Sequence, residues 1–372
     1  MKRQCQRCVM DNIGDPYITF DKNGYCNYCT DALKAKNLRY FPNADGKRQL
    51  DSIINTIKKD GQKQKYDCML GLSGGLDSSY VAYIGYQYGL RMLAVHIDDG
   101  FDVPETTKNI NKICKAYNID LVMVKLNKEQ FIVLTRAFIR AGVPNIAIPQ
   151  DNILLASLYK YAQENKIKYF LSGSNFALES ILQKGNSYDA TDKVHILDIQ
   201  RKFGKINHSS TLPLFSIFEK RIKYNFFYKI QSIKPLNYVE YNALNAFKIL
   251  NDTCGFEYYG DKHCESLLTM FMQKYYLPQK FGVDKRKSHY SSMIISGQMT
   301  REEALEKLSK PLYDDKQLQR DLAFMLKELS MSEKEFKKIM SEPPRQHSEY
   351  RTSIINRGVH VLLEIRQKAI GY

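Results

Sequence analysis

The stretch Leu72-Ser73-Gly74-Gly75-Leu76-Asp77-Ser78-Ser79 decides the fold class of this chain of 372 residues. It follows a short apolar run, Asp67-Cys68-Met69-Leu70-Gly71, and precedes a run with helical spacing, Tyr80-Val81-Ala82-Tyr83-Ile84. A strand that turns through two glycines into the start of a helix presents backbone N–H groups that bind phosphate. We therefore predict an α/β fold with a phosphate site at this loop.

The residue types of the loop indicate how it would hold a nucleotide. Paired glycines allow close approach of the backbone, serine hydroxyls donate hydrogen bonds, and a carboxylate binds Mg²⁺. The lysine of a G-x-x-x-x-G-K-[ST] loop is absent. The pattern instead resembles the SGGxDS signature of the PP-loop ATP pyrophosphatases, which implies ATP and Mg²⁺ as cofactors and a catalytic role for Asp77. The predicted cofactor-binding residues of the loop are Ser73, Gly74, Gly75, Asp77, Ser78 and Ser79.

The surrounding chain alternates between apolar runs and helical patterns, as in a parallel α/β sheet. Helices are predicted over about 78–89, 104–117 and 151–165. Ligands bind such sheets at the carboxyl ends of the strands, which is where the glycine loop lies. The predicted strands are Asp67–Leu72, Met92–Ile97, Asp120–Val124 and Lys168–Ser172.

Polar residues after two other predicted strands extend the candidate site. Asp98 and Asp99 end the second strand, and we predict Asp98 near the nucleotide; an Asp-Gly turn is the alternative. Asn175 and Glu179 follow the fourth strand and share a face if this segment is helical. We predict that both bind the ATP cofactor, and a solvated helix start is the alternative.

Four cysteines form two pairs, Cys5-x₂-Cys8 and Cys26-x₂-Cys29, separated by 17 residues. This spacing is typical of a structural zinc site, in which four thiolates leave no position open for a substrate. An iron–sulfur cluster and a redox dithiol are the alternatives. We predict Zn²⁺ bound by all four cysteines.

The composition restricts location and partners without identifying them. Lys and Arg number 55 against 40 Asp and Glu, a formal net charge of +15 that favours anionic partners. No apolar run reaches the roughly 18 residues of a membrane span, and the first residues lack a signal-peptide core. We expect a cytoplasmic protein with no membrane span.

Three regions are predicted: a zinc-binding module over 1–45, a PP-loop ATP pyrophosphatase domain over 46–250, and a mostly helical region over 251–372 that completes the active site. Phe215–Ile233 is rich in aromatic and basic residues. We expect it to be a helix with one buried face, and a helix on a membrane surface is the alternative.

A basic segment, Phe281-Gly282-Val283-Asp284-Lys285-Arg286-Lys287-Ser288-His289, lies in the last region. Cationic side chains stabilise the negative charge that builds up on phosphate during adenylyl transfer. We predict Lys285 and Arg286 as catalytic residues. The alternative is a run of charges on a solvated face.

Together, the motifs resemble the N-acetyl sugar amidotransferases of bacterial surface-polysaccharide, O-antigen and flagellar-glycan biosynthesis. The resemblance is carried by Cys5-Gln6-Arg7-Cys8-Val9-Met10-Asp11, by Phe20–Cys29, by SGGLDSS, by Asp261-Lys262-His263-Cys264-Glu265-Ser266 and by Asp284–Ala304. It implies a lipopolysaccharide-type pathway and conversion of an acetamido group of a sugar or nucleotide sugar to an acetamidino group, through an adenylylated imidate that ammonia attacks. It also implies partner subunits, a glutaminase and a cyclase-like protein, that supply the ammonia.

Two competing hypotheses remain. A PP-loop enzyme that thiolates tRNA would also suit paired cysteines and a basic chain, although we do not expect a nucleic-acid substrate. Such an enzyme needs further cysteines near the nucleotide, and Cys68 lies in an apolar run. A zinc-ribbon binding protein with a degenerate nucleotide fold is the other hypothesis, and the intact loop over Ser73–Ser79 argues against it.

Overall fold

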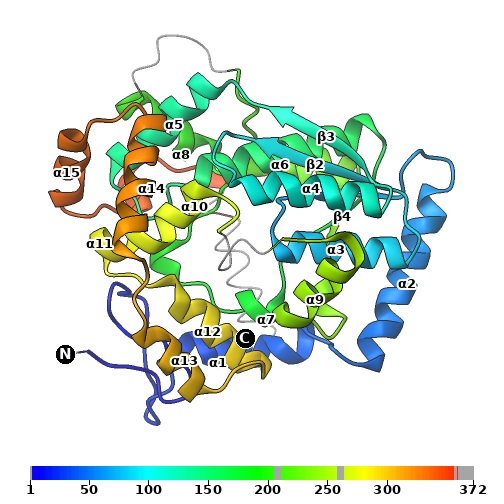
Figure 1. The fold of residues 1–372 in the computed structure, drawn as a ribbon, viewed down its shortest axis with the longest axis horizontal. Coiled ribbons are helices and arrows are strands. Elements are labelled where there is room, and N and C mark those ends of the chain that lie inside the picture. The colour runs from blue at the N-terminus through cyan, green and yellow to red at the C-terminus, as the bar shows by residue number, and fades with distance from the viewer. Residues whose placement is uncertain (1, 205–210, 258–263, 356–357, 359–372) are drawn as a thin grey trace.

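A five-stranded parallel sheet forms the centre of the computed structural model, which describes residues 2–204, 211–257, 264–355 and 358 (Figure 1). The strands lie in the order β3-β2-β1-β4-β5, and every neighbouring pair is parallel. The predicted parallel sheet is thus confirmed, and the carboxyl ends of all its strands meet at one edge. The strands are β1 (Cys68–Gly71), β2 (Met92–Asp98), β3 (Asp120–Lys125), β4 (Tyr169–Leu171) and β5 (Gln231–Ile233).

Helices make up most of the remaining chain. In the first two predicted regions they are α1 (Asn27–Arg39), α2 (Ala44–Gly61), α3 (Leu76–Gln87), α4 (Pro104–Ala116), α5 (Lys128–Ala141), α6 (Ile148–Glu164), α7 (Phe176–Glu179), η1 (Lys184–Asn186), α8 (Lys193–Phe203), η2 (Glu219–Phe227), η3 (Pro235–Asn237) and α9 (Ala243–Cys254). In the last region they are α10 (Leu267–Phe271), η4 (Met272–Tyr276), α11 (Leu277–Phe281), α12 (Lys285–Ser296), α13 (Arg301–Ser309), α14 (Asp315–Glu328), α15 (Glu333–Ser341) and η5 (His347–Glu349). The elements η2 and η4 are π-helices.

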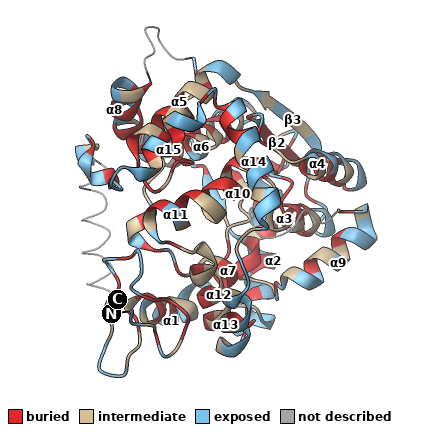
Figure 2. Ribbon diagram, turned by 60° about the vertical axis from the view of Figure 1, so that its left-hand side comes forward, coloured by how far each residue is buried: buried red, intermediate tan, exposed pale blue. Residues whose placement is uncertain are grey.

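The two faces of the sheet pack into different hydrophobic clusters because side chains alternate along a strand. In β1, Met69 belongs to one cluster, while Cys68 and Leu70 belong to the other. The first cluster contains residues of α5, α6 and α10, and the second contains residues of α2, α3 and α4. Figure 2 shows buried and exposed residues dividing the surface of α4 in the way expected for a helix that covers a sheet.

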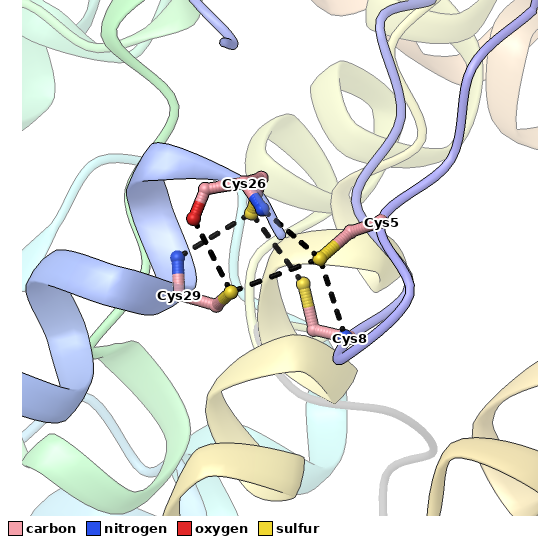
Figure 3. Close-up of side chains that lie close together, drawn as sticks. All are labelled: Cys5, Cys8, Cys26 and Cys29. Carbon is pink, nitrogen blue, oxygen red and sulfur yellow. Dashed lines mark hydrogen bonds between the residues drawn. The ribbon is translucent and has the colours of Figure 1, made fainter. Parts of the chain in front are cut away.

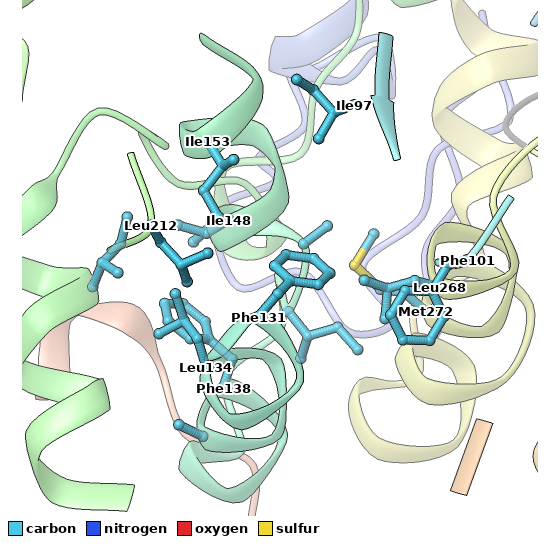
Figure 4. Packing of buried hydrophobic residues seen from close by; sticks show 14 of the residues in the cluster. Ile97, Phe101, Phe131, Leu134, Phe138, Ile148, Ile153, Leu212, Leu268 and Met272 are labelled. Atoms are coloured by element: carbon cyan, nitrogen blue, oxygen red, sulfur yellow. The ribbon is translucent and has the colours of Figure 1, made fainter. Parts of the chain in front are cut away.

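Aromatic and branched side chains fill the first cluster (Figure 4). Phe131 and Phe138 of α5 are fully buried, and Leu268 of α10 packs in the same cluster. Burial of each such side chain contributes roughly 1.5–3 kcal/mol. The cluster therefore attaches helices of the last region firmly to the α/β sheet.

The N-terminal segment packs against helices from the far end of the sequence. Figures 1 and 2 both show α1 beside α12 and α13. Lys36 of α1 donates a hydrogen bond to the carbonyl oxygen of Ile295 at 2.8 Å, and the Val9 N–H donates to Ser291 Oγ at 3.2 Å. The first and last predicted regions are thus in direct contact, and the predicted boundaries themselves stay a prediction.

One expectation about secondary structure is wrong. Phe215–Ile233 is not one helix with a buried face: it contains the π-helix η2 and then the edge strand β5. Within η2 only Tyr224 is buried. Three residues of a strand at the edge of a sheet give too short a pattern to be recognised in sequence.

Among the described residues, the structure has no helix with the length and apolar character needed to cross a membrane.

Candidate nucleotide site and metal centre

The predicted phosphate loop connects β1 to α3 at the carboxyl edge of the sheet, and Gly75 is the N-cap residue of α3. Gly74 has a φ of +74°, which side-chain-bearing residues rarely adopt. A β-carbon on Gly74 would also lie 2.7 Å from the carbonyl oxygen of Thr106. The loop therefore needs glycine here, and its N–H groups lie at the positive end of a helix.

The serines of the loop divide into two groups. Ser73 is exposed, its Oγ lies 3.0 Å from Ser78 Oγ, and it accepts a hydrogen bond from the Gly75 N–H at 3.2 Å. Ser79 is buried and donates to the carbonyl oxygen of Gly75 at 2.7 Å. Ser73 and Ser78 line the cavity, whereas Ser79 does not, although the Ser78 hydroxyl also donates to the Gly75 carbonyl oxygen, at 3.1 Å.

A cavity of about 840 Å³ opens beside the loop. It runs from the ends of β1 and β2 towards α6 on one side and α9 and α10 on the other. Among the described residues, no lysine or arginine lines it. Its carboxylates are Asp77, Asp99, Asp102, Asp151, Glu179 and Glu265.

Asp77 is held in place by two side chains from other parts of the fold. Tyr241, which is almost fully buried, donates a hydrogen bond from its hydroxyl to Asp77 Oδ1. Asn175 Nδ2 donates to Asp77 Oδ2 at 3.4 Å. A carboxylate fixed in this way, at the start of α3 and facing the cavity, is suited to hold a cation.

Asn175 and Glu179 lie at the two ends of the short helix α7. Asn175 is the N-cap residue of α7, and its Oδ1 accepts from the Leu178 N–H at 2.9 Å. It contacts Asp77, and Glu179 lines the cavity, so both lie at the same edge of the sheet.

The structure brings Lys285 but not Arg286 towards this site. Lys285 begins α12, which packs against α7, and its charge interacts with that of Glu179. Burial lowers the pKa of the Lys285 ammonium group, and the Glu179 carboxylate opposes that shift. Neither Lys285 nor Arg286 lines the cavity, and the link of Lys285 to the site is the interaction of its charge with that of Glu179.

The contacts of the Arg286 guanidinium indicate a structural role, whereas the prediction for this residue is a catalytic one. Its guanidinium bonds Asp284 at 2.8 Å and donates to the carbonyl oxygen of Lys310 at 2.8 Å. Further donation to the carbonyl of Lys307 places it at the C-terminal end of α13. The planar guanidinium is thus engaged by Asp284, two positions away, and by carbonyls that lie 21 and 24 positions further along the chain.

Of the two acids at the carboxyl end of β2, Asp99 lines the cavity and Asp98 does not. Asp98 is exposed at the end of β2, in register with Lys125 of β3. Asp99 is buried and accepts hydrogen bonds from the Phe101 N–H at 3.0 Å and from the Gln150 amide. Burial raises the pKa of Asp99 to about 6. The geometry favours Asp99 as the site residue predicted at Asp98.

A histidine that sequence reasoning missed lies beneath the loop. His96 Nδ1 is 2.8 Å from the Leu72 carbonyl oxygen, and Nε2 is 2.7 Å from Asp102 Oδ2. A carbonyl can only accept, so Nδ1 carries a proton. Burial opposes a positive charge on His96, but the bond and charge of Asp102 outweigh it and raise the pKa of the imidazole.

Residues of the C-terminal region form part of the cavity wall. Two of its residues, Ser266 and Leu267, pair with the chain that follows β2: Asp102 and Ser266 form an antiparallel bridge, and the Leu267 N–H donates to the Phe101 carbonyl at 2.8 Å. Glu265 and Ser266 both line the cavity. His208 and His263, two single histidines of the sequence, lie outside the described residues.

The four predicted metal-binding cysteines come together at the N-terminus, all fully buried (Figure 3). Their sulfur atoms lie within 4.8 Å of one another, and the Cys5–Cys29 and Cys8–Cys26 separations are both 3.7 Å. A tetrahedron with Zn–S bonds of about 2.3 Å places its sulfurs about 3.8 Å apart. The donor set and its spacing therefore fit a closed, structural zinc site.

Hydrogen-bond donors surround these sulfurs. The Cys26 N–H donates to Cys5 Sγ at 3.2 Å, and hydrogen bonds from Cys26 and Cys29 hold the pKa of the Cys5 thiol well below its usual range. Arg7 Nη1 donates to Cys29 Sγ at 3.6 Å. On the other side, Arg301 of α13 donates to the carbonyls of Cys8 and Cys5, both at 3.2 Å. The cluster is thus an attachment point for the last region of the chain.

Comparison with known proteins gives one family match. Residues 265–362 match the family described as LPS biosynthesis protein WbpG-like, C-terminal domain. This confirms the resemblance to a family of surface-polysaccharide biosynthesis. No curated protein matches the chain.

Several solved structures show a weak similarity. An NH3-dependent NAD synthetase from Campylobacter jejuni is 17% identical, covering 42% of this chain and 72% of that chain, with a TM-score of 0.30. An NMN synthetase from Francisella tularensis is 14% identical, covering 58% of this chain and 98% of that chain, with a TM-score of 0.28. A 4-thiouridine synthetase–RNA complex with bound ATP is 14% identical, covering 71% of this chain and 53% of that chain, with a TM-score of 0.34. These scores are too low to support an argument about function.

Proposed function

We propose that this chain is an ATP-dependent, AMP-forming amidotransferase of bacterial surface-polysaccharide biosynthesis, which converts an acetamido group of a sugar to an acetamidino group. The observation that carries the proposal is the glycine loop at the start of α3, which opens with Asp77 onto a cavity of about 840 Å³. The WbpG-like match over residues 265–362 supports the sugar pathway.

The reaction explains why such a cavity is needed. An amide is a poor electrophile, so its oxygen first attacks the α-phosphorus of ATP, and the bond to pyrophosphate breaks. Ammonia then adds to the imidate carbon, AMP leaves with the former amide oxygen, and the amidine remains after loss of a proton. The cavity would hold both reactants in contact. Such positioning alone supplies a large part of the rate acceleration of an enzyme.

The loop residues would bind and orient the triphosphate. Backbone N–H groups at the N-terminus of α3 and the Ser73 and Ser78 hydroxyls would donate to the departing pyrophosphate. The carboxylates of the cavity fit the oxygen-rich donor set that Mg²⁺ prefers, with Asp77 as the first candidate. When bound, Mg²⁺ would neutralise charge on the phosphates.

The remaining predicted components complete the proposal. Zinc at the four cysteines would stabilise the contact between the N-terminal segment and α13 and take no part in the reaction. Ammonia would come from separate glutaminase and cyclase-like subunits. Thiolation of tRNA is disfavoured because Cys68 is fully buried in β1 and burial raises the pKa of its thiol.

A direct test uses the purified chain with ATP, Mg²⁺, an ammonium salt and acetamido sugars or their nucleotide-linked forms. We expect AMP and pyrophosphate only when the sugar is present, and a product lighter by the difference between O and NH in mass spectrometry. Glutamine should not replace ammonium for the isolated chain. Formation of ADP, or AMP without a modified sugar, would contradict the proposal.

A further inference from the structure

The first residue of the C-terminal family match, Glu265, lies against the glycine loop. Its Oε1 is 2.8 Å from the position that a β-carbon on Gly75 would take, and Ser73 Oγ is 3.1 Å from the same position. Gly75 is the N-cap of α3, so the Glu265 carboxylate lies at the positive end of that helix. These are the surroundings that the proposed function assigns to phosphate.

The backbone of Glu265 is fixed relative to the loop. Its carbonyl oxygen accepts from the Val103 N–H at 3.1 Å and from Thr106 Oγ1 at 2.8 Å. Thr106 in turn packs against Gly74, as the close approach of its carbonyl oxygen to that glycine shows. Only the side chain of Glu265 can change position while these contacts are kept.

A carboxylate and a phosphate at the same helix terminus repel each other. A divalent cation between the two anions turns that repulsion into attraction. Mg²⁺ sites in phosphate-transfer enzymes commonly combine one or two carboxylates with the substrate phosphates. Asp77 and Glu265 both line this cavity and come from opposite regions of the chain.

We propose that Glu265 is, with Asp77, a ligand of the divalent cation that accompanies the nucleotide phosphates. The inference rests on the proposed function for the presence of a nucleotide here. It makes the metal site shared between the α/β sheet and the C-terminal region, so that binding of the metal–nucleotide complex holds the two together. Sequence reasoning assigned no role to this residue.

The test is calorimetric titration of ATP, with Mg²⁺ or with EDTA, into the wild type and Glu265→Gln. Loss of a partner in the outer shell of a metal site costs roughly 10- to 100-fold, and we expect a loss of at least that order in the affinity for Mg·ATP. Without metal, the affinity of the variant for ATP should be unchanged or higher, because a negative charge has been removed. Glu302→Gln, an exposed acid on α13, is the matched control and should behave as the wild type.

The outcomes separate the two proposals. If Glu265→Gln binds ATP more tightly both with and without Mg²⁺, the carboxylate only competes with phosphate and the ligand role is wrong. An unchanged affinity for Mg·ATP would also overturn it while leaving the proposed function intact. If the wild type binds no ATP at all, the proposed function and this inference both fail.

A separate observation concerns an exposed aromatic and basic surface on and beside η2, which we call the η2 surface. Phe226 and Phe227 are 70% and 69% exposed, although their element is anchored through Tyr224, whose ring lies 5.0 Å from that of Tyr159 in α6. The exposed members of the η2 surface are Phe218, Arg221, Ile222, Lys223, Phe226, Phe227, Tyr228 and Lys229.

Exposed rings flanked by cations match the chemistry of an anionic bilayer. Apolar side chains of an interfacial helix enter the boundary between headgroups and acyl chains, and Lys and Arg pair with lipid phosphates. Two neighbouring phenylalanines at the end of a short helix present apolar area for insertion, whereas a protein partner more often covers one helix face. We therefore propose that the η2 surface binds anionic lipid bilayers.

Sedimentation with vesicles tests this second proposal. We expect the wild type to pellet with vesicles containing phosphatidylglycerol, to stay in solution with phosphatidylcholine alone, and to be released by high salt. Phe226→Ser/Phe227→Ser should abolish pelleting with an unchanged melting temperature, while Phe324→Ser, an exposed phenylalanine of α14, should not. A wild type that ignores anionic vesicles, or a double variant that still pellets, would overturn the proposal; the first result would favour an acidic protein partner.

Discussion

The hydroxyl of Tyr241 donates a hydrogen bond to Asp77 Oδ1, joining two residues that are 164 positions apart. Tyr241 is almost fully buried, and its ring lies 5.5 Å from that of Tyr80 in α3. The bond therefore fixes the carboxylate at the start of α3 from a rigid position. The position of the Asp77 carboxylate in the proposed metal site therefore depends on Tyr241, which does not itself line the cavity.

Replacement of Tyr241 with Phe removes this donor and keeps the packing of the ring. A hydrogen bond to a charged group contributes about 1.5–3 kcal/mol, so we expect the rate of AMP formation to fall by about tenfold or more with little change in the melting temperature. Tyr86→Phe, on the exposed side of α3, is the matched control. A Tyr241→Phe variant with the turnover of the wild type would contradict a positioning role.

Asp77→Asn should abolish the sugar-dependent release of pyrophosphate while leaving the fold intact, because the amide keeps the shape of the side chain but loses the charge that holds Mg²⁺. Turnover should be measured by pyrophosphate release and folding by circular dichroism. Full activity in this variant would count against Asp77 as a metal ligand.

The four-cysteine centre should contain one zinc ion per chain. Cys29→Ser should lose the metal and lower the melting temperature, since the metal site connects the N-terminal segment to α13 through Arg301. Cys254→Ser removes a partly exposed thiol outside the cluster, and this variant should keep the metal and the melting temperature of the wild type. Elemental analysis checks the metal content, and a brown chromophore with iron in place of zinc would show that the cluster alternative is correct.

A buried histidine pair predicts how stability depends on pH. His195 Nε2 lies 3.0 Å from His347 Nδ1, and the Asn145 N–H donates to His347 Nε2. His347 Nε2 is thus an acceptor, so a neutral His347 carries its proton on Nδ1 and donates it to His195. Burial lowers the pKa of His195 to about 4 and that of His347 to about 3.

Because both values lie below the roughly 6.5 of an unfolded histidine, the unfolded chain binds more protons at acid pH. The contribution of the pair is complete above about pH 6.5 and is lost as the pH falls towards 4, by up to about 1.4 kcal/mol per pH unit for each proton. Urea unfolding at several pH values measures it. His347→Gln should flatten this dependence and His289→Gln should not; equal slopes in all three proteins would contradict the assignment.

Local patterns predicted those parts of the structure that depend on neighbours in sequence. The run from Cys68 to Ser79 predicted a strand, a glycine loop and a helix start, and the structure has all three. The spacing of Cys5, Cys8, Cys26 and Cys29 predicted a four-sulfur cluster for the same reason. In both cases a few residues of fixed spacing determine the local geometry.

The residues that sequence reasoning missed are those placed by long-range contacts. Tyr241 and Glu265 reach the loop through the fold of the chain far from it in sequence, and the sequence analysis assigned neither of them a role. His96 becomes part of the site because the chain after β2 turns back and brings Asp102 to its ring. Contacts between residues far apart in the chain cannot be predicted from the local pattern of a single sequence.

The less accurate predictions also have local physical causes. Arg286 was expected at the phosphates, but Asp284, two residues away, and the carbonyls at the end of α13 satisfy its donors. Ser79 donates to the carbonyl four residues earlier, as serines inside helices commonly do. Charge and residue type alone could not distinguish these structural bonds from contacts with a ligand.

The fate of the acetamido oxygen shows directly whether the sugar amide is activated by transfer of AMP. With a sugar whose acetamido group carries a heavy oxygen isotope, phosphorus NMR and mass spectrometry of the nucleotide product would show where that atom goes. We expect AMP that contains one labelled oxygen, pyrophosphate that contains none, and an unlabelled amidine. Unlabelled AMP, or ADP as the nucleotide product, would contradict it.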